Sequence, residues 1–353
     1  MQFHQFKKLY ISWLATLFFV SGSGLVQAKD FDDSISYGNK YPEWFKELPF
    51  HDLEQAREEA FRNGKQGLMV VFGTQGCSYC EVFVKKSLGD PELSSIVKRY
   101  FDSVGLEIFD DAEMVSPNGK PLSIKQFAKK VGAEFSPTLV FYDSSGKRVL
   151  RVTGYQSPKR FKHILNYVIN KHYRVETLSD YFRHASVESR NSRNKYSLKH
   201  DSLFSQPPHM LQRGHIATGQ PLMVLFEKAG CAECNDFHKN VLANQGVRNT
   251  LKEFEVVRFD STDGKTAIRM PNGRLTTPAS WFKRMKFSRL PALIFFNGKG
   301  EQVLETDALV KRQRMMNSLN FVLERAYEKN WTYQRFARMK GIERNMKQRM
   351  SRN

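Results

Sequence analysis

The chain has 353 residues, of which 41% are hydrophobic and four are cysteine. After the first 28 residues no stretch is apolar for long enough to cross a bilayer, which excludes further membrane spans, and the length suits two domains of ordinary size. The formal net charge of +19 favours anionic partners.

Residues 1–28 predict a secretory signal peptide. Lys7 and Lys8 give a positively charged start, residues 9–20 are apolar, and Val26 and Ala28 occupy the small-residue positions that a signal peptidase reads. An uncleaved anchor is the alternative. We therefore expect an exported, periplasmic protein. Removal of the segment takes away two lysines and leaves a formal charge of +17, so acidic proteins or anionic lipid surfaces are more plausible partners than nucleic acid.

The chain contains an internal repeat with an offset of 154 residues. The interval separates Cys77 from Cys231 and Cys80 from Cys234, and it recurs between further pairs: Phe83 and Phe237, Leu88 and Leu242, Pro117 and Pro271. The segment "SPTLVFYDSSGKRV" also matches "LPALIFFNGKGEQV". The chain is therefore predicted to be two copies of one module.

The first copy predicts alternating helices and strands. A helix with Leu53, Ala56, Ala60 and Phe61 on its apolar face is followed by a buried strand over residues 67–73. The cysteine pair then opens a helix. A second strand follows from residue 101, a strand–turn–strand unit from residue 138, and a closing helix capped by Ser157. This pattern predicts an α/β fold.

These patterns predict the division of the chain. A signal peptide (1–28) precedes the first module (29–175), a polar basic linker (176–204), the second module (205–328) and a basic helical tail (329–353). The tail carries eight lysines and arginines and one acidic residue, Glu343. It is either a solvated helix or a segment that contacts an anionic membrane surface.

All four cysteines lie in two Cys-x-x-Cys pairs, each at the point where a strand turns into a helix. A thiol at a helix N-terminus has a lowered pKa, because the helix dipole favours the thiolate, which attacks disulfides. Cys77 and Cys231 are therefore the predicted nucleophiles. Cys80 and Cys234 are predicted to resolve the mixed disulfide.

Three uses of the cysteines are alternatives to a redox-active role. A four-cysteine zinc site is disfavoured because about 150 residues separate the pairs. A c-type haem site requires a histidine after the second cysteine, but Glu81 and Asn235 stand there. Two inert structural disulfides remain an alternative, although such short loops gain little stability from closure.

Each copy resembles a domain of the thioredoxin superfamily. "CSYC" and "CAEC" match the active-site motif, and "SPT" and "LPA" match the cis-proline position, 60 residues after each first cysteine. The resemblance covers roughly residues 45–172 and 205–328. It implies two tandem folds with a central mixed sheet flanked by helices. It also implies that Ser136–Pro137 and Leu290–Pro291 bind the substrate backbone; ordinary turn prolines are the alternative.

A narrower resemblance is to exported SoxW-type proteins and to the C-terminal domain of the membrane reductase DsbD. It rests on "CSYCEVFVKKSLGDPELSSIVKRYFDSVGLEI". It implies a membrane thiol reductase of the DsbD kind as electron donor. The chain departs from typical thioredoxins because Val71 and Leu225 replace the buried aspartate; Glu107 and Asp260 are candidate substitutes through water. His238, seven residues after Cys231, either tunes that thiol or is a surface histidine.

The dipeptides inside the two motifs differ in charge. Ser-Tyr places no charge beside the first thiolate, whereas Ala-Glu places a carboxylate beside the second, which raises that thiol's pKa. We expect the Cys77/Cys80 pair to have the higher reduction potential. Electrons would then pass to it from Cys231/Cys234.

The sequence therefore predicts an exported protein thiol–disulfide oxidoreductase with two redox-active centres and a role in cell redox homeostasis. It implies no metal and no organic cofactor, and a monomer is expected. A non-catalytic binding module or chaperone with structural disulfides is the alternative. The net direction, the substrate and the activity of each pair are not predicted.

Overall fold

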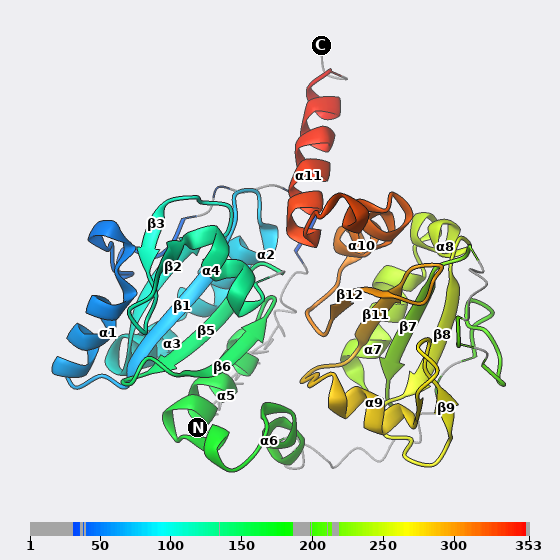
Figure 1. Cartoon of the computed structure of the whole chain (residues 1–353), viewed down its shortest axis with the longest axis horizontal. Helices are drawn as coiled ribbons and strands as arrows, with labels where there is room; N and C mark the ends of the chain where they lie inside the picture. The colour runs from blue at the N-terminus through cyan, green and yellow to red at the C-terminus, as the bar shows by residue number, and fades with distance from the viewer. Residues whose placement is uncertain are drawn as a thin grey trace, which may run out of the picture. The chain divides into compact units, whose positions relative to one another are not determined.

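The first module is built on a four-stranded mixed sheet with the order β2-β1-β5-β6. In this computed structural model, β1 pairs in parallel with β2 and antiparallel with β5. Figure 1 shows the module with its flanking helices. The strands are β1 (Gly67–Gly73), β2 (Phe101–Glu107), β5 (Thr138–Asp143) and β6 (Arg148–Thr153), and a small hairpin joins β3 (Glu113–Val115) to β4 (Pro121–Ser123). The helices are α1 (Leu53–Arg62), α2 (Ser78–Val82), α3 (Pro91–Tyr100), α4 (Ile124–Val131) and α5 (Pro158–Ile169), with a π-helical segment η2 (Phe83–Leu88) and 3₁₀ turns η1 (Pro49–His51) and η3 (His172–Arg174).

The second module repeats this architecture, with the sheet order β12-β11-β7-β8. Again the strand before the cysteines, β7, pairs in parallel with one neighbour and antiparallel with the other. Its strands are β7 (Leu222–Glu227), β8 (Glu255–Asp260), β11 (Ala292–Phe296) and β12 (Gln302–Thr306), with the hairpin of β9 (Ile268–Arg269) and β10 (Leu275–Thr276). Its helices are α7 (Ala232–Phe237), η5 (His238–Leu242), α8 (Gln245–Leu251), α9 (Pro278–Arg284), α10 (Arg312–Leu323) and η6 (Ala326–Lys329). The predicted fold class, two tandem mixed sheets flanked by helices, is confirmed.

The structure describes residues 31–35, 38, 40–133, 135–185, 198, 200–209, 211–213 and 219–350. The predicted signal peptide lies outside them. Asp32–Asn353 forms one compact unit, so contacts between its two modules are part of its structure.

Local sequence signals account for the helix boundaries. Asp90 caps α3 by accepting a hydrogen bond from the backbone N–H of Leu93, and Pro91 follows at the first helical position. Ser157 and Pro158 begin α5 in the same way. The apolar face of α5 is buried through Phe161, Ile164, Leu165 and Val168. One predicted core residue is wrong: Phe61 is 63% exposed, because α1 buries only Leu53, Ala56 and Ala60.

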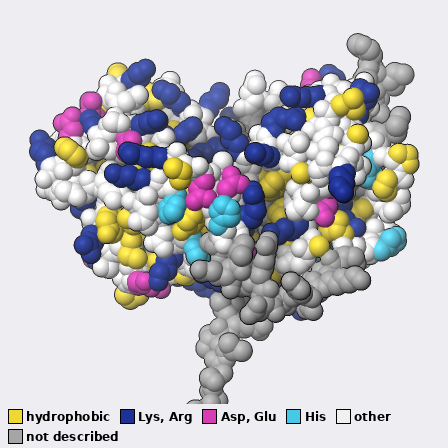
Figure 2. Space-filling view, turned by 90° about the horizontal axis from the view of Figure 1, so that it is seen from below, with side chains coloured by type: hydrophobic (Ala, Val, Ile, Leu, Met, Phe, Trp, Pro, Cys, Tyr) yellow, Lys and Arg dark blue, Asp and Glu magenta, His cyan; other side chains and the backbone are white. Residues whose placement is uncertain are grey.

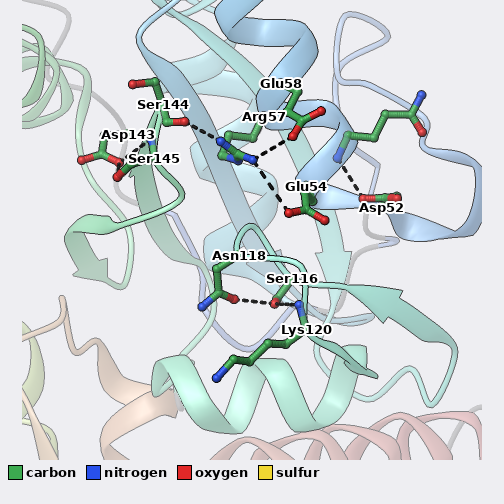
Figure 3. Close-up of polar contacts among 11 residues, drawn as sticks. Asp52, Glu54, Arg57, Glu58, Ser116, Asn118, Lys120, Asp143, Ser144 and Ser145 are labelled. Atoms are coloured by element: carbon green, nitrogen blue, oxygen red, sulfur yellow. Dashed lines mark hydrogen bonds and ion pairs between the residues drawn. The ribbon is translucent and has the colours of Figure 1, made fainter.

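Arg57 ties α1 to the turn between β5 and β6 (Figure 3). Its guanidinium donates to the carbonyl oxygen of Ser144 and lies 3.1 Å from a carboxylate oxygen of Glu58. The repeated Pro-Asn-Gly loop packs against the same turn, since a Cβ on Gly146 would lie 2.4 Å from the carbonyl oxygen of Pro117. In the second module Gly300 also lies near the equivalent proline, since its Cβ would be 3.3 Å from Cβ of Pro271, although Arg213 is closer. The repeated loop sequences therefore preserve a packing contact.

Two segments predicted from composition contain regular structure. Helix α6 (Leu178–Ala185) lies within the predicted linker, whose residues 186–197 and 199 are outside the described part. The tail forms α11 (Tyr333–Met350). Its first turns are not simply solvated, because Tyr333 and Phe336 are buried in the core of the second module. The remainder of the described tail is mostly exposed.

Positive charge is spread over the face of the molecule seen in Figure 2. On the face in Figure 2, Lys and Arg side chains are spread across the described surface, while acidic side chains are fewer. None of the described helices is long and apolar enough to cross a membrane.

Candidate functional site

The two cysteine pairs occupy equivalent positions at the ends of β1 and β7. Cys77 caps α2, and its sulfur accepts a hydrogen bond from the backbone N–H of Cys80 at 3.1 Å. Cys231 caps α7 and accepts from the N–H of Cys234 at the same distance. Each sulfur therefore lies where backbone N–H groups and the helix dipole stabilise a thiolate.

Each pair is disulfide-bonded within its own motif, Cys77 to Cys80 and Cys231 to Cys234. The leading cysteines are 8% and 7% exposed, whereas Cys80 and Cys234 are 3% and 4% exposed. An incoming sulfur therefore reaches the leading residue more readily. The division between nucleophile and resolving thiol stays a prediction.

Ser136–Pro137 and Leu290–Pro291 are the segments predicted to bind the substrate backbone, and each is called a ledge below. The two ledges share a backbone conformation but differ in solvent exposure. The Ser136–Pro137 and Leu290–Pro291 peptide bonds are both cis, as the prolines' positions predict. Ser136 and Pro137 are buried, whereas Leu290 and Pro291 are partly exposed. Only the second ledge therefore presents itself to an incoming chain.

Residues of the second module bind both backbone polar groups of Ser136. The carbonyl oxygen accepts a hydrogen bond from Arg314 at 2.8 Å, and the N–H donates to the side-chain oxygen of Gln334 at 3.2 Å. Arg314 is 6% exposed and Gln334 is 8% exposed. The first ledge is thus occupied by the chain itself.

Tyr79, which lies between the two cysteines of the first pair, is held by the same region. Its hydroxyl donates to Asp33 at 2.8 Å and accepts from the backbone N–H of Lys311 at 3.0 Å. The guanidinium carbon of Arg314 lies 3.4 Å from the centre of the ring. Burial raises the pKa of Tyr79 well above its ordinary value, so the hydroxyl remains a neutral donor.

The second pair borders an open cavity of about 260 Å³. Its lining includes Pro291 and the two residues between the cysteines, Ala232 and Glu233, both of which are exposed. The charged side chains of the lining are Glu233, Asp236 and Arg289, a net formal charge of −1. The predicted carboxylate beside Cys231 is therefore part of an accessible acidic rim.

A buried carboxylate in the second module was missed by the sequence reasoning. Glu227, at the end of β7, is 2% exposed, and its carboxylate lies 2.6 Å from Nε2 of His238 and 3.8 Å from Arg258. His238 is therefore not a surface histidine. Because strand residues alternate between faces, Glu227 shares the face of Leu225, where typical thioredoxins carry the buried aspartate. The sequence signal available for this carboxylate was Glu227 itself, a charged residue two positions after the apolar Leu225.

Glu107 and Asp260, the predicted substitutes for that aspartate, bind local backbone groups instead. Glu107 accepts from the N–H of Gln75 at 2.9 Å, and Asp260 accepts from the N–H of Thr262 at 2.8 Å. No described contact connects either carboxylate to a cysteine. Their suggested role as proton acceptors stays a prediction.

The thioredoxin-like domain family matches the chain twice, over residues 53–169 and 215–323. Among solved structures, a thioredoxin-fold protein from Helicobacter pylori is 25% identical, with a TM-score of 0.31 over 35% of this chain and 82% of that chain. A thioredoxin from Thermus thermophilus is 23% identical, with a TM-score of 0.27 over 34% and 85%. The DsbD C-terminal domain of Neisseria meningitidis is 11% identical, with a TM-score of 0.23 over 29% and 81%. No curated protein matches the chain.

Proposed function

Because the chain belongs to the thioredoxin-like domain family and holds a disulfide at equivalent helix starts in both modules, we propose that it is a thiol–disulfide oxidoreductase. The observation that carries the proposal is the position of Cys77 and Cys231 as helix caps, with each sulfur accepting a backbone N–H. This position favours the thiolate that the reaction needs.

In the proposed reaction, the thiolate of Cys77 or Cys231 attacks one sulfur of a substrate disulfide. The other substrate sulfur leaves as a thiolate and takes a proton. The resolving cysteine, Cys80 or Cys234, then loses its proton and attacks the leading sulfur. The substrate leaves as a dithiol, and two electrons have passed from the protein to the substrate. The reverse sequence oxidises a substrate dithiol.

Protein disulfides are the proposed substrates of the second site. Its ledge, Leu290–Pro291, is partly exposed beside an open cavity, which suits an extended polypeptide bound along the backbone. Burial of Cys234 beneath Cys231 supports release of the product by the inner thiol. A DsbD-like membrane reductase is the proposed electron donor.

The surroundings of the cysteines support the predicted order of reduction potentials. The cavity at the second site has a net formal charge of −1, which disfavours a thiolate at Cys231. The cavity at the first site is lined by three arginines and one aspartate, a net formal charge of +2, which favours a thiolate at Cys77. A stabilised thiolate makes a disulfide more oxidising, so electrons would pass from Cys231/Cys234 to Cys77/Cys80.

Trapping of mixed disulfides tests the proposal. Cys234→Ser should leave Cys231 covalently attached to substrate proteins, visible as reducible adducts after non-reducing electrophoresis. Cys231→Ser is the matched control and should give none. If Cys234→Ser gives no adduct with a reducible protein disulfide, and the reduced protein transfers no electrons, the non-catalytic binding module becomes the better account.

The proposed compartment is the periplasm, reached through residues 1–28. Fractionation of cells that express the full chain and a chain without residues 1–28 tests this directly. Deletion of residues 339–353 in the same experiment tests membrane-surface contact by the basic tail. It should shift the protein from the membrane fraction to the soluble fraction if that contact exists.

A further inference from the structure

The first site is closed to an extended polypeptide by the protein's own second module. A substrate backbone would have to bind Ser136, but its N–H and carbonyl oxygen are already bonded to Gln334 and Arg314. Ser136 is 1% exposed. At the second site the first module bonds to Ser288 and Arg289, just before the ledge, but no described residue bonds to the backbone of Leu290, and Pro291 lines the cavity. The two sites therefore differ in the size of the substrate that they admit.

A smaller opening remains beside Cys77. It is a cavity of about 230 Å³ lined by Cys77, Ser78 and Tyr79 on one side and by residues of α10 and α11 on the other. Because the backbone of Ser136 is already bonded, a substrate cannot extend along it. The cavity therefore suits a single amino-acid or short peptide arm whose remainder extends into solvent.

The lining of this cavity is cationic. Arg314, Arg338 and Arg344 face a single carboxylate, that of Asp33. The carboxylate already accepts hydrogen bonds from the backbone N–H groups of Gln313 and Arg314 and from the hydroxyl of Tyr79. The carboxylate of Asp33 is therefore already bound by backbone groups at the start of α10 and by Tyr79.

Two arginines of the lining, Arg338 and Arg344, are not paired with a carboxylate among the described residues. Arg314 bonds to Ser136 and Leu309, but neither Arg338 nor Arg344 forms an ion pair with a carboxylate within the described part of the chain. Arg338 lies over the ring of Phe109, with its guanidinium carbon 5.2 Å from the ring centre. Two guanidinium groups beside a reactive sulfur are suited to carboxylates, which they bind through paired hydrogen bonds.

A buried hydroxyl supplies an independent sign of a polar ligand. Thr74, which also lines the cavity, is 2% exposed, and its hydroxyl has no hydrogen-bond partner among the described residues. A buried polar atom without a partner is costly, and such atoms are rare in native structures. A polar group of a ligand beside Cys77 would satisfy it.

Building on the proposed function, we propose that the first site exchanges disulfides with a small anionic disulfide that carries carboxylate groups, rather than with a protein. The thiolate of Cys77 attacks one sulfur of the small disulfide, and the first small thiol leaves and takes a proton. Cys80 then loses its proton and attacks the sulfur of Cys77, which releases the second small thiol. Two electrons pass from the protein dithiol to the small disulfide. Arg338 and Arg344 bind the carboxylates.

The test uses the full chain with Cys231→Ser and Cys234→Ser, so that only the first site reacts. The reduced protein is mixed with glutathione disulfide, which is anionic, with cystamine, which is cationic, and with oxidised dithiothreitol, which is neutral. We expect glutathione disulfide to react at least about tenfold faster than cystamine, because opposite charges attract at short range. The matched control with Cys77→Ser and Cys80→Ser should not show this preference.

The double variant Arg338→Gln and Arg344→Gln should lower the rate with glutathione disulfide about tenfold, since it removes charge-assisted bonds. Its rate with oxidised dithiothreitol should be unchanged, which also shows that the site is folded. Lys347→Gln, an exposed change on the same helix, should alter neither rate. An unchanged charge preference in the double variant overturns this inference. Failure of both isolated sites with every disulfide overturns the proposed function instead.

Discussion

The two modules share a sheet, a capped cysteine and a cis-proline, yet they differ in the residues between the cysteines and in the charge of the adjoining cavity. In the first module the residues between the cysteines, Ser78 and Tyr79, are buried, whereas Ala232 and Glu233 are exposed in the second. The adjoining cavities have net formal charges of +2 and −1. A duplicated frame thus holds the same reactive group in two different settings. We infer that the residues around each cysteine pair, and not the shared fold, decide which disulfide each site reacts with.

The largest expected effect comes from opening the first site. Arg314→Ala removes the donor to the carbonyl oxygens of Ser136 and Leu309. Leaving two buried acceptors without partners should lower the free energy of unfolding by about 3 kcal/mol. It should also raise the rate at which reduced Cys77 is alkylated, bringing it closer to that of Cys231.

The matched control is Arg312→Ala, an exposed residue at the start of the same helix. It should change neither the denaturation midpoint nor the alkylation rate. If Arg314→Ala leaves the first site as protected as before, then the second module does not control access to Cys77.

The next effect concerns a buried charge at a repeated position that carries no charge in the first module. Glu227 lies between His238 and Arg258, whereas the corresponding position of the first module, 154 residues earlier, is Gly73. Glu227→Gln should destabilise the protein by about 2 to 4 kcal/mol, because Arg258 and His238 both lose a buried carboxylate partner. Denaturant unfolding measures this change. A double-mutant cycle with His238→Gln should show a coupling energy, and additive effects would mean that the pair is not an interaction unit.

Asp201 gives a smaller effect with a defined pH dependence. A hydrogen bond from Arg248 lowers the pKa of Asp201 to about 2, from an ordinary value of 3.8. The folded state therefore favours the ionised carboxylate. Its contribution is present above about pH 4 and is lost as the pH falls toward 2. Because the pair is partly exposed, we expect about 1 kcal/mol.

Asp201→Asn is the variant for this measurement. Its difference in unfolding free energy from the parent chain should be constant near neutral pH, should shrink between about pH 4 and pH 2, and should vanish only below about pH 2, where the carboxyl of Asp201 is protonated in both states. A difference that stays constant down to pH 2 would mean that the ion pair does not contribute through its charge.

The sequence was sufficient for features that repeat or obey local rules. The 154-residue offset paired the two cysteine motifs, and the resemblance to the thioredoxin superfamily located the cis peptide bonds before Pro137 and Pro291. A short-range signal located the Ser157 cap of α5. These features depend on neighbours within a few residues or on the fold that both copies share.

The closure of the first site could not be predicted, because its partners are far apart in sequence. Arg314 is 178 residues from Ser136, and Gln334 is 198 residues from it. No periodicity distinguishes a buried arginine in α10 from an exposed one in the same helix. The pairing of Glu227 with His238 was missed for a similar reason, since a strand residue and a later helix residue meet only in three dimensions.

The smallest predicted effect isolates the charge difference between the two sites. Glu233 lines the second cavity beside Cys231, and its carboxylate disfavours a neighbouring thiolate. Glu233→Gln should therefore lower the pKa of the Cys231 thiol, and only slightly, since the side chain is exposed and solvent weakens the interaction. The pH dependence of alkylation measures this in a chain with Cys77→Ser and Cys80→Ser. Asp236→Asn removes the same charge from another residue of the cavity lining and should have a weaker effect.

Because a lower thiol pKa accompanies a more oxidising disulfide, Glu233→Gln should also narrow the difference in reduction potential between the sites. If the pKa and the potential both stay unchanged, the local carboxylate does not set the order of the two potentials.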